Sequence, residues 1–91
     1  MNFEKAVRRE LAGIGDLLVA KNKSYGNAAL DPLRVFSRAN PSEQIRVRID
    51  DKLSRLARGD VTALPSETLA DTIDDLLGYL ILLKISEAQK K

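Results

Sequence analysis

The chain has 91 residues and a formal net charge of +2, from 15 Lys and Arg against 13 Asp and Glu. This length suits one domain, and the balanced charge does not indicate nucleic-acid binding. Because the sequence contains neither Cys nor His, it excludes disulfides, thiolate metal sites and histidine catalysis. We expect a single helical domain over residues 1–91. A chain this small buries little surface alone and is typically stabilised by oligomerisation.

No segment suggests a membrane protein or an exported one. The longest strongly apolar stretch, Leu76 to Leu83, is far shorter than the ~18 residues that a membrane-spanning helix needs. The first residues, including Asn2, Phe3 and Glu4, lack the basic and then apolar pattern of a signal peptide. We therefore expect a cytoplasmic protein without a membrane partner.

The first predicted helix runs from about Asn2 to Asn22. Its apolar residues share one face of a helical wheel, and they are Phe3, Val7, Ile14, Leu17 and Leu18. Gly13 and Gly15 weaken the helix and are interpreted as a site of close packing against another helix. Glu10 and Lys21 also point towards the apolar side. Glu10 is expected either to lie at the rim of that side or, if it is inward and near Lys52, to form a structural pair or part of a site.

The helical period lapses between Lys23 and Asn40, although a short helical piece is predicted around Leu33 to Arg38. The sequence KNKSYG at residues 21–26 places lysines beside an aromatic ring. In one interpretation Tyr25 stacks on a base or ribose while Lys23 reaches a phosphate. In the other, Tyr25 covers the helix end and Gly26 serves as its C-cap.

The second predicted helix begins with Asn40 as N-cap, Pro41 in the first helical position and Glu43 three residues after the cap. It continues to Ala57 or Arg58, where Gly59 is a natural terminator.

Three cations, Arg48, Lys52 and Arg55, border the apolar stripe of this second helix. They are candidates for binding phosphate oxygens, since Arg offers a bidentate fork and Lys a point charge. The alternative is structural, because long basic side chains commonly lie over apolar surface and pair with acids one turn away.

The third predicted helix starts at Pro65-Ser66-Glu67 and runs to about Glu87. Its apolar stripe lies opposite a row of acids, namely Glu67, Asp71, Asp74 and Asp75. The repulsion within this row predicts either a hard cation such as Mg²⁺, held by Asp71, Asp74 and Asp75, or a facing row of Arg and Lys. The plainer interpretation is a solvated first turn stabilised by the helix dipole.

The C-terminal half of the third helix is apolar on nearly every side, since Gly78, Ile81, Leu82 and Ile85 occupy the flank that the acids hold earlier. A helix of this kind is buried all round or packs against another chain. We therefore expect a homo-oligomer formed through the third helix.

The segments KNKSYG, RVRIDDKLSRL and ETLADTIDDLLGYLILL occur in this order, and together they resemble the phage and bacterial family called nucleotide modification associated domain, type one. The resemblance covers roughly Leu17 to Leu83, and its most specific parts are IDDKLSRL and D-x-x-D-D-L-x-x-Y. Ser24 departs from the Asp that the family is expected to carry before Tyr-Gly. The resemblance implies a nucleotide or a nucleotide-derived small molecule as the partner.

A more distant likeness is to the MazG-type all-α nucleotide pyrophosphohydrolases, which place acids of two helices around Mg²⁺. By position it implies Asp50 or Asp51 for the first acidic pair, and Asp71 with Asp74 or Asp75 for the second. Asp50 and Asp51 are adjacent, so they point about 100° apart on a helix and the E-x-x-E spacing is absent.

Three functions follow from these observations. The first is Mg²⁺-dependent hydrolysis of a nucleoside triphosphate or modified nucleotide, with Asp71, Asp75 and Asp50 as catalytic residues. Lys23, Tyr25, Arg48, Lys52 and Arg55 would then bind the nucleotide. The second is an oligomeric protein that sequesters a nucleotide signal without chemistry, as a phage does against host defence. The third is a structural helical module whose charges all lie on its surface.

Overall fold

The computed structural model shows an all-α bundle of three helices, as the sequence predicts. Helix α1 spans Phe3–Ser24, α2 spans Pro41–Ala57 and α3 spans Leu69–Ala88. The structure describes residues 1–24, 26, 28–30, 35–58 and 68–89, and no strand occurs among them. None of the helices in these ranges has the length and apolarity needed to cross a membrane.

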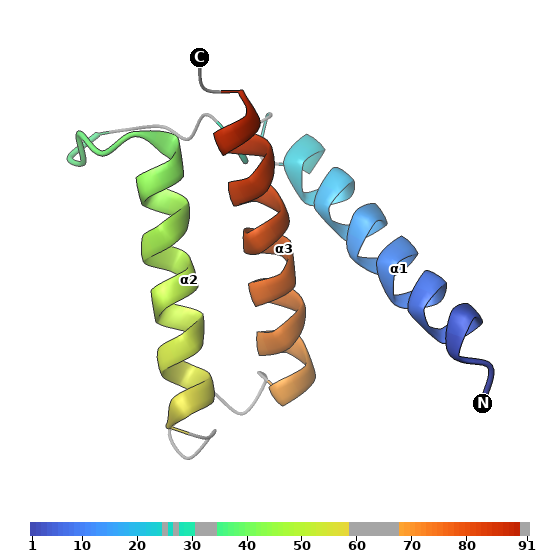
Figure 1. Ribbon diagram of the computed structural model, residues 1–91. Helices are drawn as coiled ribbons and strands as arrows, with labels where there is room; N and C mark the ends of the chain where they lie inside the picture. Colours follow the sequence, from blue (N-terminus) through green and yellow to red (C-terminus); the bar gives the residue numbers. More distant parts are fainter. Residues whose placement is uncertain (25, 27, 31–34, 59–67, 90–91) are drawn as a thin grey trace.

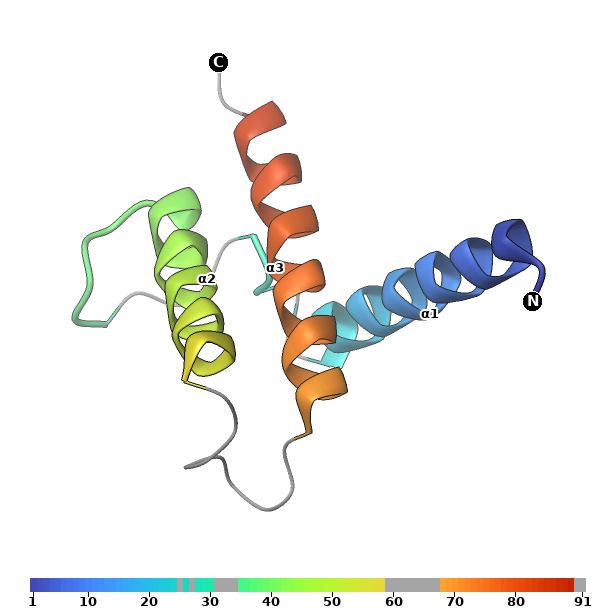
Figure 2. The same cartoon turned by 60° about the horizontal axis from the view of Figure 1, so that its bottom comes forward.

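Helices α2 and α3 lie side by side and antiparallel, as Figures 1 and 2 show from two directions. Helix α1 meets α3 only through its C-terminal half, and both views show its N-terminal half projecting away from the other two helices. The bundle therefore consists of a helical hairpin, α2–α3, with one helix leaning on it at an angle.

The start of α2 is confirmed in its predicted position. Asn40 has an extended backbone, and its side-chain oxygen accepts a hydrogen bond of 2.8 Å from the backbone N–H of Glu43. Pro41 opens the helix, where its missing N–H costs no hydrogen bond. The predicted end at Ala57 is also confirmed, whereas Gly59 lies outside the described residues.

The start of α3 differs from the prediction. Pro65, Ser66 and Glu67 lie outside the described residues, and the N-cap of α3 is Thr68. The Thr68 hydroxyl accepts a hydrogen bond of 3.1 Å from the Asp71 backbone N–H, while the Asp71 carboxylate accepts one of 3.1 Å from the Thr68 backbone N–H. This reciprocal capping box assigns Asp71 a structural role.

Because of the capping box, the stability of the fold depends on pH. Hydrogen bonds from the backbone N–H and the hydroxyl of Thr68 hold the pKa of Asp71 below its ordinary value of 3.8. A depressed carboxyl pKa stabilises the fold above the unfolded value and loses that contribution as the pH falls through the folded value. We expect melting temperatures measured from pH 5 downward to decline less steeply below about pH 3.8 in Asp71→Asn than in the wild type. Parallel declines would contradict this assignment.

Glycine marks the contact between α1 and α3, but not at the predicted positions. Nothing approaches within 4 Å of a Cβ placed on Gly13 or Gly15, so the predicted close packing at these residues is wrong. Instead, Gly78 of α3 is buried, and a Cβ there would lie 3.1 Å from Cδ2 of Leu18. The missing side chain at Gly78 lets α1 approach α3.

The core of this bundle is small. Among the described residues the buried hydrophobic side chains are those of Ile14, Ile45 and Ile49, one from α1 and two from α2. A buried hydrogen bond of 2.6 Å joins the hydroxyls of Ser42 and Ser86, and it links the start of α2 to the end of α3. The core thus holds α2 and α3 together and anchors only one end of α1.

The loop between α1 and α2 is described only in part. Val35 to Arg38 are not helical, so the short helical piece predicted there is wrong for these residues, while Leu33 and Arg34 lie outside the described residues. At the start of the loop, the Asn22 side-chain oxygen accepts a hydrogen bond of 3.0 Å from the backbone N–H of Ala29. This contact folds the chain back against the end of α1.

Candidate functional site

A pocket of about 390 Å³ opens where the three helices converge. It is lined by the C-terminal half of α1, the N-terminal half of α2 and the middle of α3, together with Ala28 and Ala29 of the loop. Figure 1 shows α1 leaning at an angle on the α2–α3 hairpin, and residues of all three helices line the pocket. The pocket therefore depends on the position of α1.

Most of the pocket wall is apolar. Its aliphatic side chains come from all three helices, and they are Ile14, Leu17, Leu18, Ile45 and Leu82. Gly78 contributes backbone, and Tyr79 contributes an aromatic ring. Apolar walls with a few polar groups are typical of pockets that bind small molecules, which usually have volumes of about 300–1,000 Å³.

The polar part of the wall contains two cations, two carboxylates and two amides. They are Lys21, Arg48, Asp74, Asp75, Asn22 and Gln44. The Gln44 amide donates a hydrogen bond of 3.1 Å to the carbonyl of Ala39, which fixes its orientation at the start of α2. These groups present both charges and hydrogen-bonding atoms to whatever occupies the pocket.

Asp75 is the centre of an ion-pair cluster that joins the three helices. Its carboxylate lies 2.9 Å from Nζ of Lys52 on α2 and 3.8 Å from Nζ of Lys21 on α1. The side chain of Lys52 is only 11% exposed, whereas that of Lys21 is 50% exposed. The short Lys52–Asp75 contact is therefore the stronger of the two, because solvent screens it less.

The Lys52–Asp75 pair is expected to contribute to stability. Asp75→Asn removes the carboxylate from a largely buried ammonium group, at a cost of about 1–3 kcal/mol, between the values for exposed and fully buried pairs. A double-mutant cycle with Lys52→Met, measured by urea unfolding, should give a coupling free energy clearly different from zero. Additive effects of the two single substitutions would contradict a direct interaction.

Arg48 and Tyr79 form the other charged contact at the pocket. The guanidinium carbon of Arg48 lies 5.9 Å from the centroid of the Tyr79 ring, within the range of a cation–π interaction. This contact leaves the hydrogen-bond donors at the edge of the guanidinium able to bind an anion. Arg48 thus places a positive charge beside an aromatic surface on the pocket wall.

The pocket brings together only some of the residues that the sequence singles out. Arg48, Asp74 and Asp75 line it, and Lys52 adjoins it through Asp75. The other candidates that the structure describes are absent from its wall, namely Lys23, Asp50, Arg55 and Asp71. Arg55 instead pairs with Asp51 at 3.2 Å along α2. Tyr25 lies outside the described residues.

The predicted acidic row does not form a metal-binding group. Within the described ranges no three carboxylates lie together in a way that holds a metal ion, and this includes Asp71, Asp74 and Asp75. Asp71 bonds to Thr68, and Asp75 faces Lys52. The three carboxylates of the row therefore do not converge on one metal ion. For Asp75 the structure agrees with the other prediction, that cations of neighbouring helices face the acids.

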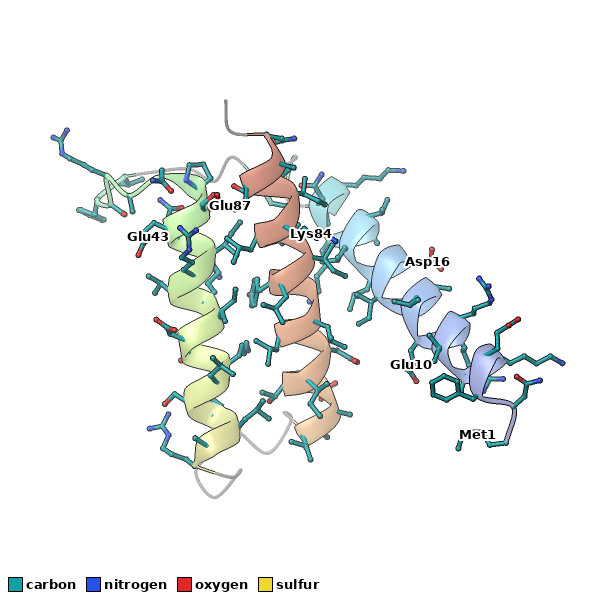
Figure 3. The ribbon with its side chains drawn as sticks, viewed as in Figure 1. Met1, Glu10, Asp16, Glu43, Lys84 and Glu87 are labelled. Atoms are coloured by element: carbon teal, nitrogen blue, oxygen red, sulfur yellow. The ribbon has the colours of Figure 1, made fainter. Side chains whose placement is uncertain are left out.

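Glu10 takes the predicted rim position and not the inward position near Lys52. It is exposed and forms no ion pair within the part of the chain that the structure describes, whereas Lys52 pairs with Asp75. Figure 3 shows Glu10 on the N-terminal half of α1, away from the hairpin. Lys21, the other polar residue predicted on the apolar side of α1, does reach the Asp75 cluster.

Three polar or aromatic residues of the pocket wall, Tyr79, Asn22 and Gln44, are not among the candidate site residues that the sequence predicts. Tyr79 belongs to the D-x-x-D-D-L-x-x-Y segment and follows Asp75 by one helical turn, so it was detectable as a neighbour on the same face. No sequence pattern points to Asn22 or Gln44. Their side chains form hydrogen bonds with the backbone of Ala29 and Ala39 in the loop, and a helical wheel does not show such contacts.

Comparison of the chain with protein-family models, with curated proteins and with solved structures finds no match.

Proposed function

We propose that this protein binds a nucleotide, or a small molecule derived from one, in the three-helix pocket and retains it without hydrolysing it. The observation that carries the proposal is the combination of an apolar pocket of about 390 Å³ with Arg48, Lys21 and Tyr79 on its wall. A base or sugar requires an apolar, aromatic surface, and a phosphate requires cations.

The arrangement of the polar groups supports a nucleotide better than a purely apolar ligand. Tyr79 and the aliphatic wall offer a surface for the base, and Arg48 and Lys21 offer charge for a phosphate. Asp74 and the Gln44 amide can accept hydrogen bonds from ribose hydroxyls or exocyclic amines. The resemblance to the nucleotide modification associated family points to the same class of ligand.

The state of the carboxylates supports retention rather than hydrolysis. Metal-assisted attack on a phosphate requires carboxylates that converge on the ion. Here Asp71 caps α3, Asp75 is engaged by Lys52, and Asp50 is absent from the pocket wall. A sequestering protein of the kind used against nucleotide signals requires only the pocket and its cations.

One observation favours Mg²⁺-dependent hydrolysis as a second candidate. Asp74 and Asp75 are adjacent, and both line the pocket, so a nucleotide would lie close to two carboxylates. Phosphate oxygens of the substrate complete the coordination of Mg²⁺ in many enzymes that hold the ion with one or two carboxylates. In this function Asp75 would have to exchange its contact with Lys52 for the metal.

Two arginines of α2 provide a matched test of the site. Arg48 lines the pocket, whereas Arg55, one of the other candidate phosphate-binding residues, pairs with Asp51 outside it. In titration calorimetry with nucleoside mono-, di- and triphosphates, Arg48→Met should weaken binding of the best ligand about 10–100-fold, because charge-assisted hydrogen bonds contribute roughly 1.5–3 kcal/mol. Arg55→Met should leave the affinity within about twofold, as for a screened surface pair.

The same titrations distinguish the functions. Equal losses in the two arginine variants would contradict the assignment of the pocket as the binding site. If the wild-type protein binds none of these nucleotides, the proposal fails and the structural helical module remains.

A further inference from the structure

The isolated chain exposes more surface than a compact protein of its mass. Its accessible surface is 7304 Å², about 2,000 Å² more than the roughly 5,300 Å² typical of a folded 10.1 kDa monomer. The buried hydrophobic side chains of the described residues number three, and large hydrophobic side chains such as Phe3, Leu11 and Leu77 are exposed. Apolar side chains therefore form part of the exposed surface.

Part of this apolar surface is the N-terminal half of α1. Phe3, Val7 and Leu11 follow at intervals of four residues and lie on the same side of the helix as buried Ile14. Their exposed fractions are 78%, 39% and 63%. Neither α2 nor α3 covers this half of α1 in either view (Figures 1 and 2). The face that packs on α3 near Gly78 thus continues without a partner towards the N-terminus.

The other part is an exposed stripe along α3. Ile73, Leu77 and Leu80 lie along it, with exposed fractions of 41%, 43% and 45%. The buried residues Thr72 and Ser86 lie about 100–140° around the helix from Ile73, so they belong to a different face of α3. Two apolar stripes, one on each of two helices, therefore remain open in the single chain.

The excess is large enough to form an interface with a second copy. If each of two copies buried half of its excess, about 1,000 Å², the interface would total about 2,000 Å², at the boundary between standard and obligate dimers. Burial of the whole excess would give about 4,000 Å², which is within the range of obligate dimers. A second copy can also cover both stripes, because its α3 stripe can pack on the α1 stripe of the first copy and its α1 stripe on the α3 stripe of the first copy.

Charge is complementary across the same two stripes. Glu10 lies beside Val7 and Leu11 on α1, and Lys84 lies one turn beyond Leu80 on α3. Both side chains are exposed, and neither has an ion pair within the described residues. Figure 3 shows them on α1 and on α3 of the same chain, with Glu10 on the free half of α1. An acid on one apolar stripe and a base on the other favour pairing of unlike stripes.

We infer that the protein forms a symmetric homodimer in which the N-terminal half of α1 packs against the exposed stripe on α3 of the other copy. Glu10 of each chain then pairs with Lys84 of the partner subunit, so the contact occurs twice. The dimer covers Phe3, Val7 and Leu11 with the Ile73–Leu77–Leu80 stripe. It holds α1 at both ends, and α1 forms one wall of the pocket.

A charge-swap experiment tests this arrangement. In light scattering after gel filtration, the wild type should have twice the chain mass of 10.1 kDa. Glu10→Lys and Lys84→Glu should each weaken dimerisation about tenfold or more, because each places two like-charge pairs in the interface. Mixing the two variants should restore a one-to-one heterodimer, because both of its contacts then join unlike charges.

The outcome of mixing is informative even if a variant loses structure as a monomer, because the heterodimer should regain helical circular dichroism. A wild type that is monomeric at micromolar concentration would overturn the inference. So would variants that both remain dimeric, or a mixture that stays monomeric.

Discussion

Gly78→Leu is expected to weaken ligand binding strongly while leaving the α2–α3 hairpin folded. A Cβ at this position already lies 3.1 Å from Cδ2 of Leu18, so a leucine side chain there has to displace Leu18 or move α1 away from α3. Overpacking of this kind costs typically 1–3 kcal/mol. Because α1 supplies one wall of the pocket, its displacement should weaken nucleotide binding at least about tenfold, which corresponds to about 1.4 kcal/mol.

Gly13→Ala is the matched control for this substitution. Gly13 lies inside α1, and nothing approaches within 4 Å of a Cβ placed there. Alanine should therefore stabilise the helix by about 0.5–1 kcal/mol through its better helical propensity. Calorimetry should show unchanged affinity for Gly13→Ala and a large loss for Gly78→Leu. Normal binding by Gly78→Leu would show that the contact of α1 with α3 does not form the site.

The second large effect is expected from the core. Ile49→Ala should destabilise the protein by about 2–4 kcal/mol, because it removes a buried side chain and leaves a cavity between α2 and α3. Ile49 is 9% exposed and is not part of the pocket wall. Its effect should therefore appear in the free energy of unfolding and not in the affinity of the folded protein.

Val47→Ala is the corresponding control, since Val47 lies two residues away on α2 and is 59% exposed. Its cost should remain within about 0.5 kcal/mol, as for most surface substitutions. Urea unfolding followed by circular dichroism, at a fixed protein concentration, measures both variants. Equal destabilisation by the two substitutions would mean that α2 and α3 are not held together by the Ile49 side of α2.

Local sequence patterns predict the helices well because their signals act within a few residues. The periodic stripe of α1 and the Asn40–Pro41–Glu43 start of α2 both correspond to the observed elements. The pattern Pro65-Ser66-Glu67 predicts a start of α3 that lies before the observed one. Thr68, with Asp71 three residues later, forms the capping box instead.

The candidate site was less predictable, because a helical wheel does not reveal which helix packs on which face. The acids of α3 were expected to act as one row, but Asp71 is used by the helix start and Asp75 by Lys52. Asp71 and Asp75 have different partners because α1 and α2 pack around α3 beside Asp75. Contacts between residues distant in sequence, such as Lys21–Asp75, are not contained in any local pattern.

The same limit applies to the glycines. Gly13 and Gly15 suggested close packing because two small residues on a helix often mark an approach. The approach occurs at Gly78 of α3, where the sequence offers a single glycine in an apolar run. Gly78 differs from Gly13 and Gly15 because Leu18 packs against it. Leu18 lies 60 residues earlier in the chain, so no local pattern reveals this contact.

We propose that the pocket binds a nucleotide and leaves it intact. The most direct measurement is calorimetric titration of the wild-type protein with the best-binding nucleotide, once with Mg²⁺ and once with EDTA, followed by chromatography of the recovered ligand. We expect similar affinity in both buffers and recovery of the unchanged nucleotide. Release of pyrophosphate or a monophosphate only in the presence of Mg²⁺, with loss of that activity in Asp75→Asn, would contradict it.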